Sequence, residues 1–230
     1  MSELVLDRVT VNRGAGPVIR DVSLRLTAGA ITALVGPNGA GKTSLLEAIS
    51  GVVPAAAGTI VMDGKPLDRI SRVGRYRSGL AHIEQGRAVF ADLTVTENLR
   101  LTTRNDAEVD RALEIFPELD KRRNSTANLL SGGEQQMLVL ARSFAAEPRF
   151  LLIDEMSLGL APVVFQRLLP FVQRFAEHGT GVLLVEQFTH MALGIATEAM
   201  VVSSGRVSYH GAAQPLRDSP ATLHAAYLGG

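Results

Sequence analysis

The sequence predicts an α/β fold with an antiparallel β sub-lobe near its start and a helical sub-lobe in its middle. Three observations support this fold class. Apolar runs at 31–35, 150–153 and 181–185 have the length and branched side chains of buried parallel strands. Residues 4–11 and 18–26 alternate between apolar and polar side chains, as half-buried antiparallel strands do. In the middle of the chain the apolar residues recur at helical spacing instead.

Composition narrows the class of protein. The 23 Lys and Arg residues balance 23 Asp and Glu residues, and a formal net charge of zero argues against bulk electrostatic binding of nucleic acid. There is no cysteine, which excludes disulfides, thiolate metal sites and a cysteine nucleophile. The N-terminal residues do not resemble a signal peptide, and no run approaches the roughly 20 apolar residues of a membrane helix. We therefore expect another chain to hold the protein at any membrane where it works.

The first core strand, 31–35, leads through a glycine-rich loop into a helix that begins near 44. The loop has the spacing G-x-x-x-x-G-K-[ST] of a phosphate-binding P-loop. Glycines let backbone N–H groups wrap an anion, and the helix start adds unpaired N–H groups. A lysine here adds charge for the β- and γ-phosphates, and a threonine hydroxyl can bind Mg²⁺. The alternative is an ordinary glycine-rich turn. The loop residues are Gly36, Pro37, Asn38, Gly39, Ala40, Gly41, Lys42 and Thr43.

The next segment leads from the P-loop helix to the helical sub-lobe. Residues 59–62 predict a short strand that ends at an Asp-Gly turn, and 80–83 predict a core strand that leads to Gln85. The arginines at 69, 72, 75 and 77 are expected to form a solvated face. Residues 94–101 and 105–116 predict short helices.

A second glycine-rich helix start lies at 130–136, with the sequence LSGGEQQ. Ser131 and Glu134 have the spacing of a capping box, which is one complete explanation for these two residues. It does not explain Gly132 and Gly133, since glycines in the first turn destabilise a helix. We therefore expect a second anion-binding helix terminus here.

The apolar strand 150–153 ends at two adjacent carboxylates, Asp154 and Glu155. Carboxylates at the end of a buried strand are costly unless they bind something. In P-loop proteins an aspartate at this place holds Mg²⁺, and the next acid can act as general base on the attacking water. A strand that simply ends in a polar loop is the alternative.

After Glu155, helices and strands are predicted to alternate along the chain. A helix over 162–178 should be kinked or broken at Pro170. A strand follows at 181–185 and a short helix at 191–196. Residues 200–203 and 206–210 predict a hairpin, and 214–228 a terminal helix interrupted near Pro220.

In this order, the P-loop at 36–43, Gln85, the signature 130–135 and the strand into Asp154-Glu155 resemble the nucleotide-binding subunit of an ABC transporter. The resemblance implies a P-loop NTPase (RecA-like) core over 1–87 and 149–230, with a helical sub-lobe over 88–148. It also implies ATP and Mg²⁺ as ligands. The residues 36–44, which include Ser44, would hold the triphosphate, and Thr43, Gln85 and Asp154 would surround Mg²⁺.

The same resemblance implies that Glu155 is the catalytic base and that Lys42 and Gln187 contact the γ-phosphate. The signature residues of one subunit would reach ATP bound to a second ATPase subunit, of the same or a related chain, in a head-to-tail dimer. Residues 85–93, which include Val89 and Phe90, would face transmembrane permease subunits. The protein would then be peripheral, at the cytoplasmic face of the cell membrane. The signature residues are Ser131, Gly132, Gly133 and Glu134.

A narrower resemblance is to the ATPase subunits of branched-chain amino-acid importers, which also use a substrate-binding protein. It rests on residues 85–90, 93–99, 157–162, 185–187 and 226–230. Urea or short-chain amide importers remain an alternative, as does an ABC ATPase that does not transport. A P-loop kinase or switch GTPase would not need the 130–135 signature, and a binding module without hydrolysis conflicts with Lys42 and Glu155.

Three positions depart from the family pattern. Arg13 stands where the family usually stacks an aromatic ring on adenine, and a guanidinium can also stack on a planar base. Gln187 stands at the switch position that usually holds histidine, and His190 is expected to be a surface histidine. Met156 replaces a proline that is commoner there, with little expected effect on the chemistry.

Overall fold

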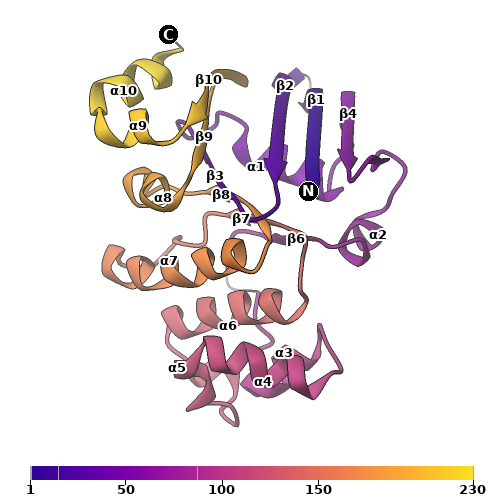
Figure 1. Ribbon diagram of the computed structural model, residues 1–230, viewed down its shortest axis with the longest axis vertical. Coiled ribbons are helices and arrows are strands. Elements are labelled where there is room, and N and C mark those ends of the chain that lie inside the picture. The colour runs from indigo at the N-terminus through magenta and orange to yellow at the C-terminus, as the bar shows by residue number, and fades with distance from the viewer. Residues whose placement is uncertain (1, 15, 87, 230) are drawn as a thin grey trace.

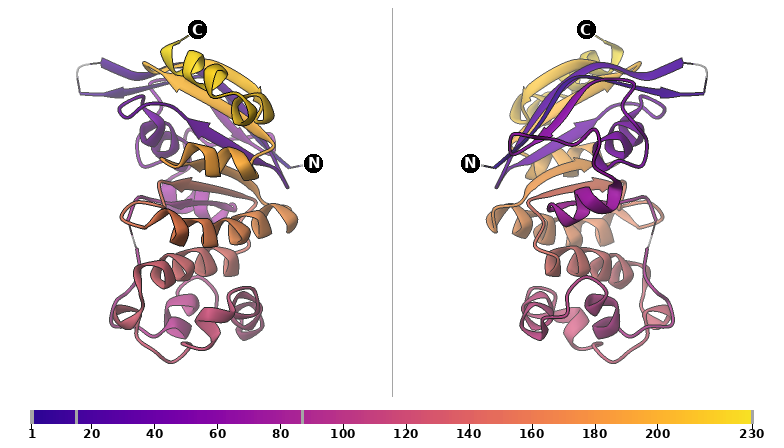
Figure 2. Two further views of the ribbon diagram at one scale, coloured as in Figure 1. Left: turned by 90° about the vertical axis from the view of Figure 1, so that its left-hand side faces the viewer. Right: turned by 90° about the vertical axis from the view of Figure 1, so that its right-hand side faces the viewer.

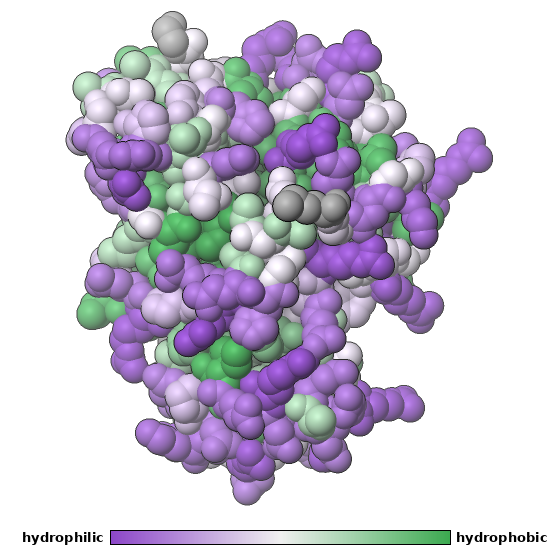
Figure 3. Space-filling model, in the orientation of Figure 1, coloured by the Kyte–Doolittle hydropathy of each residue, from purple (hydrophilic) through white to green (hydrophobic). Residues whose placement is uncertain are grey.

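The structure is a computed structural model that describes residues 2–14, 16–86 and 88–229. A six-stranded sheet lies in the middle, a four-stranded sheet lies at one end, and helices form the other end (Figure 1). The two side views show the same stacking of layers (Figure 2). On the face seen in Figure 1 the surface is mostly hydrophilic, with apolar patches in the region around α7 (Figure 3). Helix α7 spans Pro162–Glu177.

The six-stranded sheet has the order β10-β9-β3-β8-β7-β6. All neighbours are parallel except β9 and β10, which form an antiparallel hairpin. Because parallel strands end at the same edge, the segments that follow β3, β6, β7 and β8 meet there. The strands are β3 (Ile31–Val35), β6 (Leu80–Ile83), β7 (Phe150–Asp154), β8 (Gly181–Val185), β9 (Glu198–Ser203) and β10 (Arg206–Ala212).

The antiparallel sheet has the order β2-β1-β4-β5. Leu4 pairs with Leu26 and Leu6 with Leu24, so the alternating apolar side chains of both strands share the buried face. This face packs with the P-loop helix α1 (Lys42–Ser50) in one apolar cluster. The strands are β1 (Glu3–Arg13), β2 (Gly16–Thr27), β4 (Ala57–Met62) and β5 (Lys65–Pro66).

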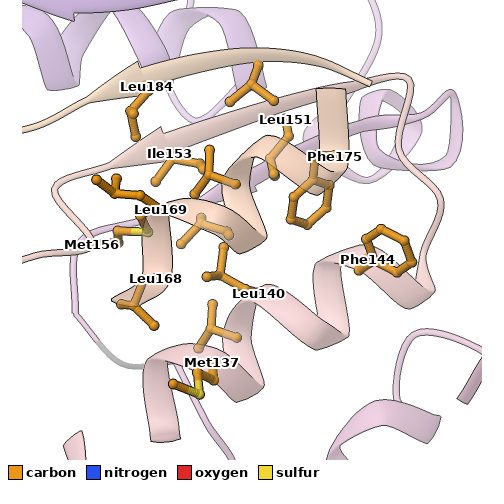
Figure 4. Packing of buried hydrophobic residues seen from close by; sticks show 14 of the residues in the cluster. Met137, Leu140, Phe144, Leu151, Ile153, Met156, Leu168, Leu169, Phe175 and Leu184 are labelled. Carbon is orange, nitrogen blue, oxygen red and sulfur yellow. The ribbon is translucent and has the colours of Figure 1, made fainter. Parts of the chain in front are cut away.

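Two apolar clusters cover the two faces of the six-stranded sheet. On β7, Phe150 and Leu152 face the cluster that contains α1, whereas Leu151 and Ile153 face the cluster that contains α6 and α7. Figure 4 shows side chains of α6 and α7 packed against β7 and β8. Every residue of β7 and β8 is buried, as expected for parallel strands covered on both faces. Helix α6 spans Gly132–Ala145.

Between β6 and β7 the described chain carries helices and no named strand. Rings of Phe116 and Phe171, 4.4 Å apart, stack between this helical region and α7. The elements are α3 (Val95–Arg100), α4 (Asp106–Ile115), α5 (Pro117–Asp120), the 3₁₀ helix η1 (Ala127–Leu129) and α6.

Three of the remaining helices contribute residues to the apolar cluster that contains α6 and α7. The predicted terminal helix is interrupted as expected, since α9 (Gln214–Asp218) ends just before Pro220. The others are α2 (Arg72–Arg77), α8 (Thr189–Ile195) and α10 (Pro220–Leu228). No helix of the described residues is long and apolar enough to cross a membrane.

Of the kink or break expected at Pro170, the break does not occur. Helix α7 runs through Pro170 as one element, held by a buried face of Phe165, Leu168 and other apolar residues. Pro170 and Gln166, the residue four positions earlier, are both exposed. The hydrogen bond that proline cannot make is therefore lost on the solvent side, where water can replace it.

The expectation of a wholly solvated arginine cluster is wrong for Arg75. Its side chain is buried, and its guanidinium donates hydrogen bonds to four backbone carbonyls. Two of these, of Ala48 and Ile49, lie at the C-terminal end of α1, where helix carbonyls lack partners within the helix. Arg75 therefore closes the end of the P-loop helix.

Candidate functional site

The P-loop takes its path from close packing on neighbouring strands. Gly36 has φ +151°, and a Cβ there would lie 2.1 Å from the carbonyl oxygen of Val202 on β9. Gly41 has φ +99°, and its Cβ would lie 2.6 Å from the carbonyl oxygen of Val18 on β2. Only glycine fits at these two positions, so the loop is fixed between the two sheets.

Lys42 begins α1 and is only 6% exposed. Its Nζ donates to the carbonyls of Gly36 at 2.8 Å and Pro37 at 3.0 Å, which brings the ammonium back over the loop. Burial lowers the pKa of Lys42, while the nearby charges of Glu155 and Asp154 raise it. The structure thus places a partly desolvated cation at the loop.

Asp154, at the end of β7, is 1% exposed. Its carboxyl group accepts hydrogen bonds from the side chains of Thr43 and Gln85, yet its Oδ1 has no hydrogen-bond partner among the described residues. The pKa of Asp154 is raised to about 6, mainly by burial and also by the charge of Glu155, although the two hydrogen bonds and the charge of Lys42 lower it. A buried carboxylate oxygen without a partner suits a cation.

The oxygen-bearing side chains of Thr43, Gln85 and Asp154 fit Mg²⁺, but they do not fit a metal site made of protein ligands alone. The hydroxyl of Thr43 lies 3.5 Å from Nε2 of Gln85, and both side chains adjoin Asp154. Along the described chain, no group of three or more His, Cys, Asp or Glu residues could hold a metal ion. Mg²⁺ in nucleotide sites commonly takes one or two protein carboxylates and completes its shell with phosphates and water.

Glu155 and Gln187 face each other across the same edge of the sheet. Nε2 of Gln187 donates to Oε2 of Glu155 at 3.2 Å. Glu155 has a left-handed backbone (φ +45°), and its N–H donates to the carbonyl of Val185 at 2.9 Å. Both side chains line a pocket of about 310 Å³ together with Asn38, Gly39, Gly41, Lys42, Thr43, Ser44, Gln85 and Val18.

Arg13 lies beside this pocket, at the first turn of α1. Its Nε donates to the hydroxyl of Ser44 at 3.3 Å, and its guanidinium forms an ion pair with Glu47. The arginine is therefore near the P-loop, with its charge shared with a glutamate on α1. His190 is exposed on α8 and lines none of the described pockets at this edge.

The signature residues form a separate site at the start of α6. Ser131 and Glu134 make the predicted capping box: the Glu134 carboxylate accepts from the Ser131 N–H at 2.8 Å, and the Ser131 hydroxyl accepts from the Glu134 N–H at 3.3 Å. A Cβ on Gly133 would lie 2.7 Å from a methyl group of Val164, so packing on α7 also favours glycine here. Sequence reasoning did not foresee that second reason.

The helix start opens into a pocket of about 510 Å³, also lined by Glu118, Met137, Gly159, Leu160, Ala161, Val164 and Arg167. This pocket shares no lining residue with the P-loop pocket. The fold therefore brings residues 36–44, 85, 154, 155 and 187 together and keeps residues 131–134 apart from them. Arg87, part of the sequence pattern at 85–87, lies outside the described residues, as does Gly230 of the terminal pattern.

Sequence reasoning missed two contacts at this edge. The Tyr227 hydroxyl of α10 lies 3.0 Å from the Thr189 hydroxyl, and both residues line a pocket of about 290 Å³ with Lys42 and Glu155. Glu186, directly after β8, is buried and bonded to Ser157. The available signal for Glu186 was a charged residue next to an all-apolar strand, the same signal that identified Asp154.

Comparisons with known proteins agree with this geometry. The family described as ABC transporter matches residues 19–157. The high-affinity branched-chain amino acid transport ATP-binding protein BraG of Pseudomonas aeruginosa is 39% identical over 233 residues, 99% of this chain and 100% of that protein. The probable branched-chain amino acid transport ATP-binding protein LivF of Archaeoglobus fulgidus is 35% identical over 86% of this chain and 87% of that protein.

The lipopolysaccharide export system ATP-binding protein LptB of Escherichia coli is 34% identical over 84% of each chain. Among solved structures, a nucleotide-free ATP-binding cassette from an ABC transporter aligns with a TM-score of 0.86 over 100% of both chains, at 21% identity, which shows the fold. An ATP-binding subunit of an ABC transporter aligns at 0.82 with 27% identity over 98% of both chains. The P-loop geometry, the family match and the full-length relative together show that this chain belongs to the ABC transporter family, among its ATP-binding, ATP-hydrolysing subunits.

Proposed function

We propose that the chain binds Mg-ATP in the P-loop pocket, hydrolyses it and thereby powers the import of branched-chain or other hydrophobic amino acids. One observation supports the chemistry above all others. Lys42, Thr43, Gln85, Glu155 and Gln187 line one pocket, and Asp154 adjoins it with an unpartnered buried oxygen. A cation, oxygen ligands and a carboxylate base at one P-loop are the parts that phosphoryl transfer to water needs.

Each residue has a role in this proposal. The N–H groups of residues 36–44 and the ammonium of Lys42 bind the phosphates. Thr43, Gln85 and Asp154 hold Mg²⁺, which when bound neutralises charge on the phosphate oxygens. Glu155 accepts the proton of the attacking water, and Gln187 orients the Glu155 carboxylate through their hydrogen bond.

Arg13 is proposed to stack on the adenine ring, because its guanidinium lies at Ser44, beside the pocket. This use of Arg13 competes with its ion pair to Glu47. The division into a core of 1–87 and 149–230 and a helical sub-lobe of 88–148 is proposed with the same family pattern in view. The helices between β6 and β7 support it.

A second subunit completes the site. The pocket at Ser131, Gly132, Gly133 and Glu134 shares no residue with the P-loop pocket of its own chain. Helix N–H groups that open onto a pocket can bind an anion. We therefore propose a head-to-tail dimer, of two copies or of this chain and a related one, in which residues 131–134 reach the γ-phosphate on the partner.

Residues 85–93 are proposed to dock on a permease at the cytoplasmic face of the membrane. Phe90 is 55% exposed, and Arg142 lies 5.7 Å from the centre of its ring. A substrate-binding protein would deliver the substrate to that permease. Import of branched-chain amino acids is supported by the names of the BraG and LivF relatives. A urea or short-chain amide importer and a non-transport ABC ATPase remain the alternatives.

The chemistry is tested with the full chain and its Glu155→Gln variant. The wild type should hydrolyse ATP in the presence of Mg²⁺, and Glu155→Gln should bind ATP, lose turnover and double its mass in light scattering. Glu177→Gln, the same change at an exposed position on α7, should behave as wild type. Turnover of Glu155→Gln near the wild-type rate would refute the base assignment.

The substrate is tested by uptake. Cells that lack the chain should lose uptake of radiolabelled leucine and regain it with the wild type but not with Glu155→Gln. Loss of urea uptake with leucine uptake intact would instead select the amide importer.

A further inference from the structure

Glu186 is a buried carboxyl group that the proposed chemistry does not use. It follows the last residue of β8 and is 2% exposed. Its Oε1 accepts a hydrogen bond from the backbone N–H of Ser157 at 3.3 Å, and its Oε2 accepts one from the Ser157 hydroxyl. The backbone N–H of Gln187 also donates to it. A buried carboxyl group with three donors around it is held in one place.

Ser157 belongs to the turn that carries Glu155. The turn begins after β7, and Ser157 is 3% exposed within it. Glu155 adopts a left-handed backbone (φ +45°), and the N–H of Leu158 donates back to the Glu155 carbonyl at 3.1 Å. A left-handed conformation costs a non-glycine residue about 1–2 kcal/mol and persists only where the surroundings fix it.

The turn is held to the end of β8 at two of its residues, Glu155 and Ser157. The carbonyl of Val185 accepts from the Glu155 N–H at 2.9 Å, and the next residue, Glu186, holds Ser157. The same strand end also leads to Gln187, whose amide contacts Glu155. If the hydrogen bonds between Ser157 and Glu186 are lost, the backbone of the turn is held to the end of β8 only through the Glu155 N–H, and its left-handed residue can relax.

The turn also leads toward the signature pocket. The Ser157 carbonyl accepts from the N–H of Leu160 at 2.9 Å, and Gly159 and Leu160 line the pocket of about 510 Å³ beside Ser131. Ser157 therefore lies on the chain segment that joins the wall of one pocket to the wall of the other.

We propose that Glu186 is a positioning residue for ATP hydrolysis: by holding Ser157, it fixes the turn that aims the Glu155 carboxylate into the nucleotide pocket. The inference rests on the proposed role of Glu155 as base. In this role Glu186 acts on Glu155 through the geometry of the turn.

The contact between Glu186 and Ser157 depends on shape and hydrogen bonding rather than on charge. Burial raises the pKa of Glu186 to about 7, and the charge of Glu155 acts in the same direction. A site that accepts the neutral carboxyl group near neutral pH should accept glutamine, whose oxygen can face the Ser157 N–H and whose amide can face the Ser157 hydroxyl. Alanine cannot reach Ser157.

The test compares Glu186→Gln, Glu186→Ala and Ser157→Ala in the full chain, by kcat, KM for Mg-ATP, nucleotide Kd and Tm. Glu186→Gln should keep kcat within about threefold. Glu186→Ala and Ser157→Ala should lower kcat by about 10- to 100-fold, as misplacement of a catalytic group by about 1 Å does, with KM and Kd within about twofold. The double variant, with alanine at both 157 and 186, should be no slower than Glu186→Ala, because both changes remove the same contact.

Glu198→Ala, an exposed glutamate at the start of β9, is the control and should match wild type. Ser157→Ala keeps the test informative if Glu186→Ala does not fold. The inference is overturned if Ser157→Ala or a folded Glu186→Ala keeps kcat within about threefold, or if kcat falls only in step with Tm and Kd and glutamine does not rescue it. If the wild type itself fails to hydrolyse ATP, or Glu155→Gln turns over like wild type, the proposed function fails first and this inference with it.

Discussion

Arg75 offers a stability test that separates a buried cation from a solvated one on the same helix. Its Nη1 donates to the carbonyls of Ala48 and Ile49, both at 2.7 Å. Its Nη2 donates to Leu67 at 2.9 Å and its Nε to Ile70 at 3.0 Å. The change to methionine keeps the apolar stem but removes all four donors. We expect it to loosen the C-terminal end of the P-loop helix.

The expected loss of stability in Arg75→Met depends on which of the four carbonyls keep another hydrogen-bond donor. The carbonyl of Ala48 also accepts from the Gly51 N–H, and that of Leu67 from the Ile70 N–H. Among the described residues, the carbonyls of Ile49 and Ile70 have no donor besides Arg75, and each acceptor left unpaired costs about 1–3 kcal/mol, or about 2–6 kcal/mol together. The guanidinium is itself desolvated, and burial lowers the pKa of Arg75, so relief of that penalty offsets part of the loss. A net loss of about 3 kcal/mol is expected.

Urea unfolding followed by circular dichroism measures this loss, and in a chain of this length it should lower Tm by about 6–12 °C. Arg77→Met, two residues later with an exposed side chain, is the control and should change the free energy of unfolding by less than about 0.5 kcal/mol. If Arg75→Met lies within about 1 kcal/mol of Arg77→Met, at an unchanged slope against urea, the reasoning is refuted.

Three further predictions concern the backbone and a half-buried histidine. Gly36→Ala places a Cβ 2.1 Å from the Val202 carbonyl oxygen and should lower Tm strongly in thermal unfolding. In Gly39→Ala the added Cβ meets nothing within 4 Å, so this variant should cost only about 1–2 kcal/mol of left-handed strain. Burial lowers the pKa of His82 in the folded protein to about 4, whereas the pKa in the unfolded chain is about 6.5. Between pH 7 and 5 the unfolded state therefore gains a proton that the folded state does not, which favours unfolding. Over this range the wild type should lose about 2 kcal/mol of stability, and His82→Asn should not. Pro170→Ala should restore a helix hydrogen bond on the exposed face of α7 and raise the free energy of unfolding by about 1–2 kcal/mol, as measured in urea.

Each of these has an outcome that contradicts it. Equal Tm values for the Gly36 and Gly39 variants would show that the strand contact at Gly36 is not limiting. Parallel pH dependences of wild type and His82→Asn would contradict the depressed histidine pKa. A Pro170→Ala variant less stable than wild type would show that the proline is needed where it stands.

The sequence determined the elements that rest on local pattern. The strands predicted at 31–35, 150–153 and 181–185 are confirmed, because short apolar runs rich in branched side chains are typical of strands buried on both faces. The start of α6 was predictable because Ser131 and Glu134 satisfy each other's N–H groups within one turn. The P-loop was predictable because its glycines, lysine and threonine have fixed spacing along a single strand-loop-helix unit.

Other parts of the site depend on contacts between segments far apart in the chain. The pairing of Glu186 with Ser157, of Tyr227 with Thr189 and of Arg75 with the end of α1 could not be predicted, because nothing in one segment indicates which distant residue it will contact. The neighbours that would crowd a side chain at Gly36 and Gly133 are likewise on other elements. The sequence alone therefore determined which chemical groups the protein carries. Only the tertiary structure decided which of them are buried, which carry strain and which touch, because burial and long-range contact exist only once the sheets and helices pack together.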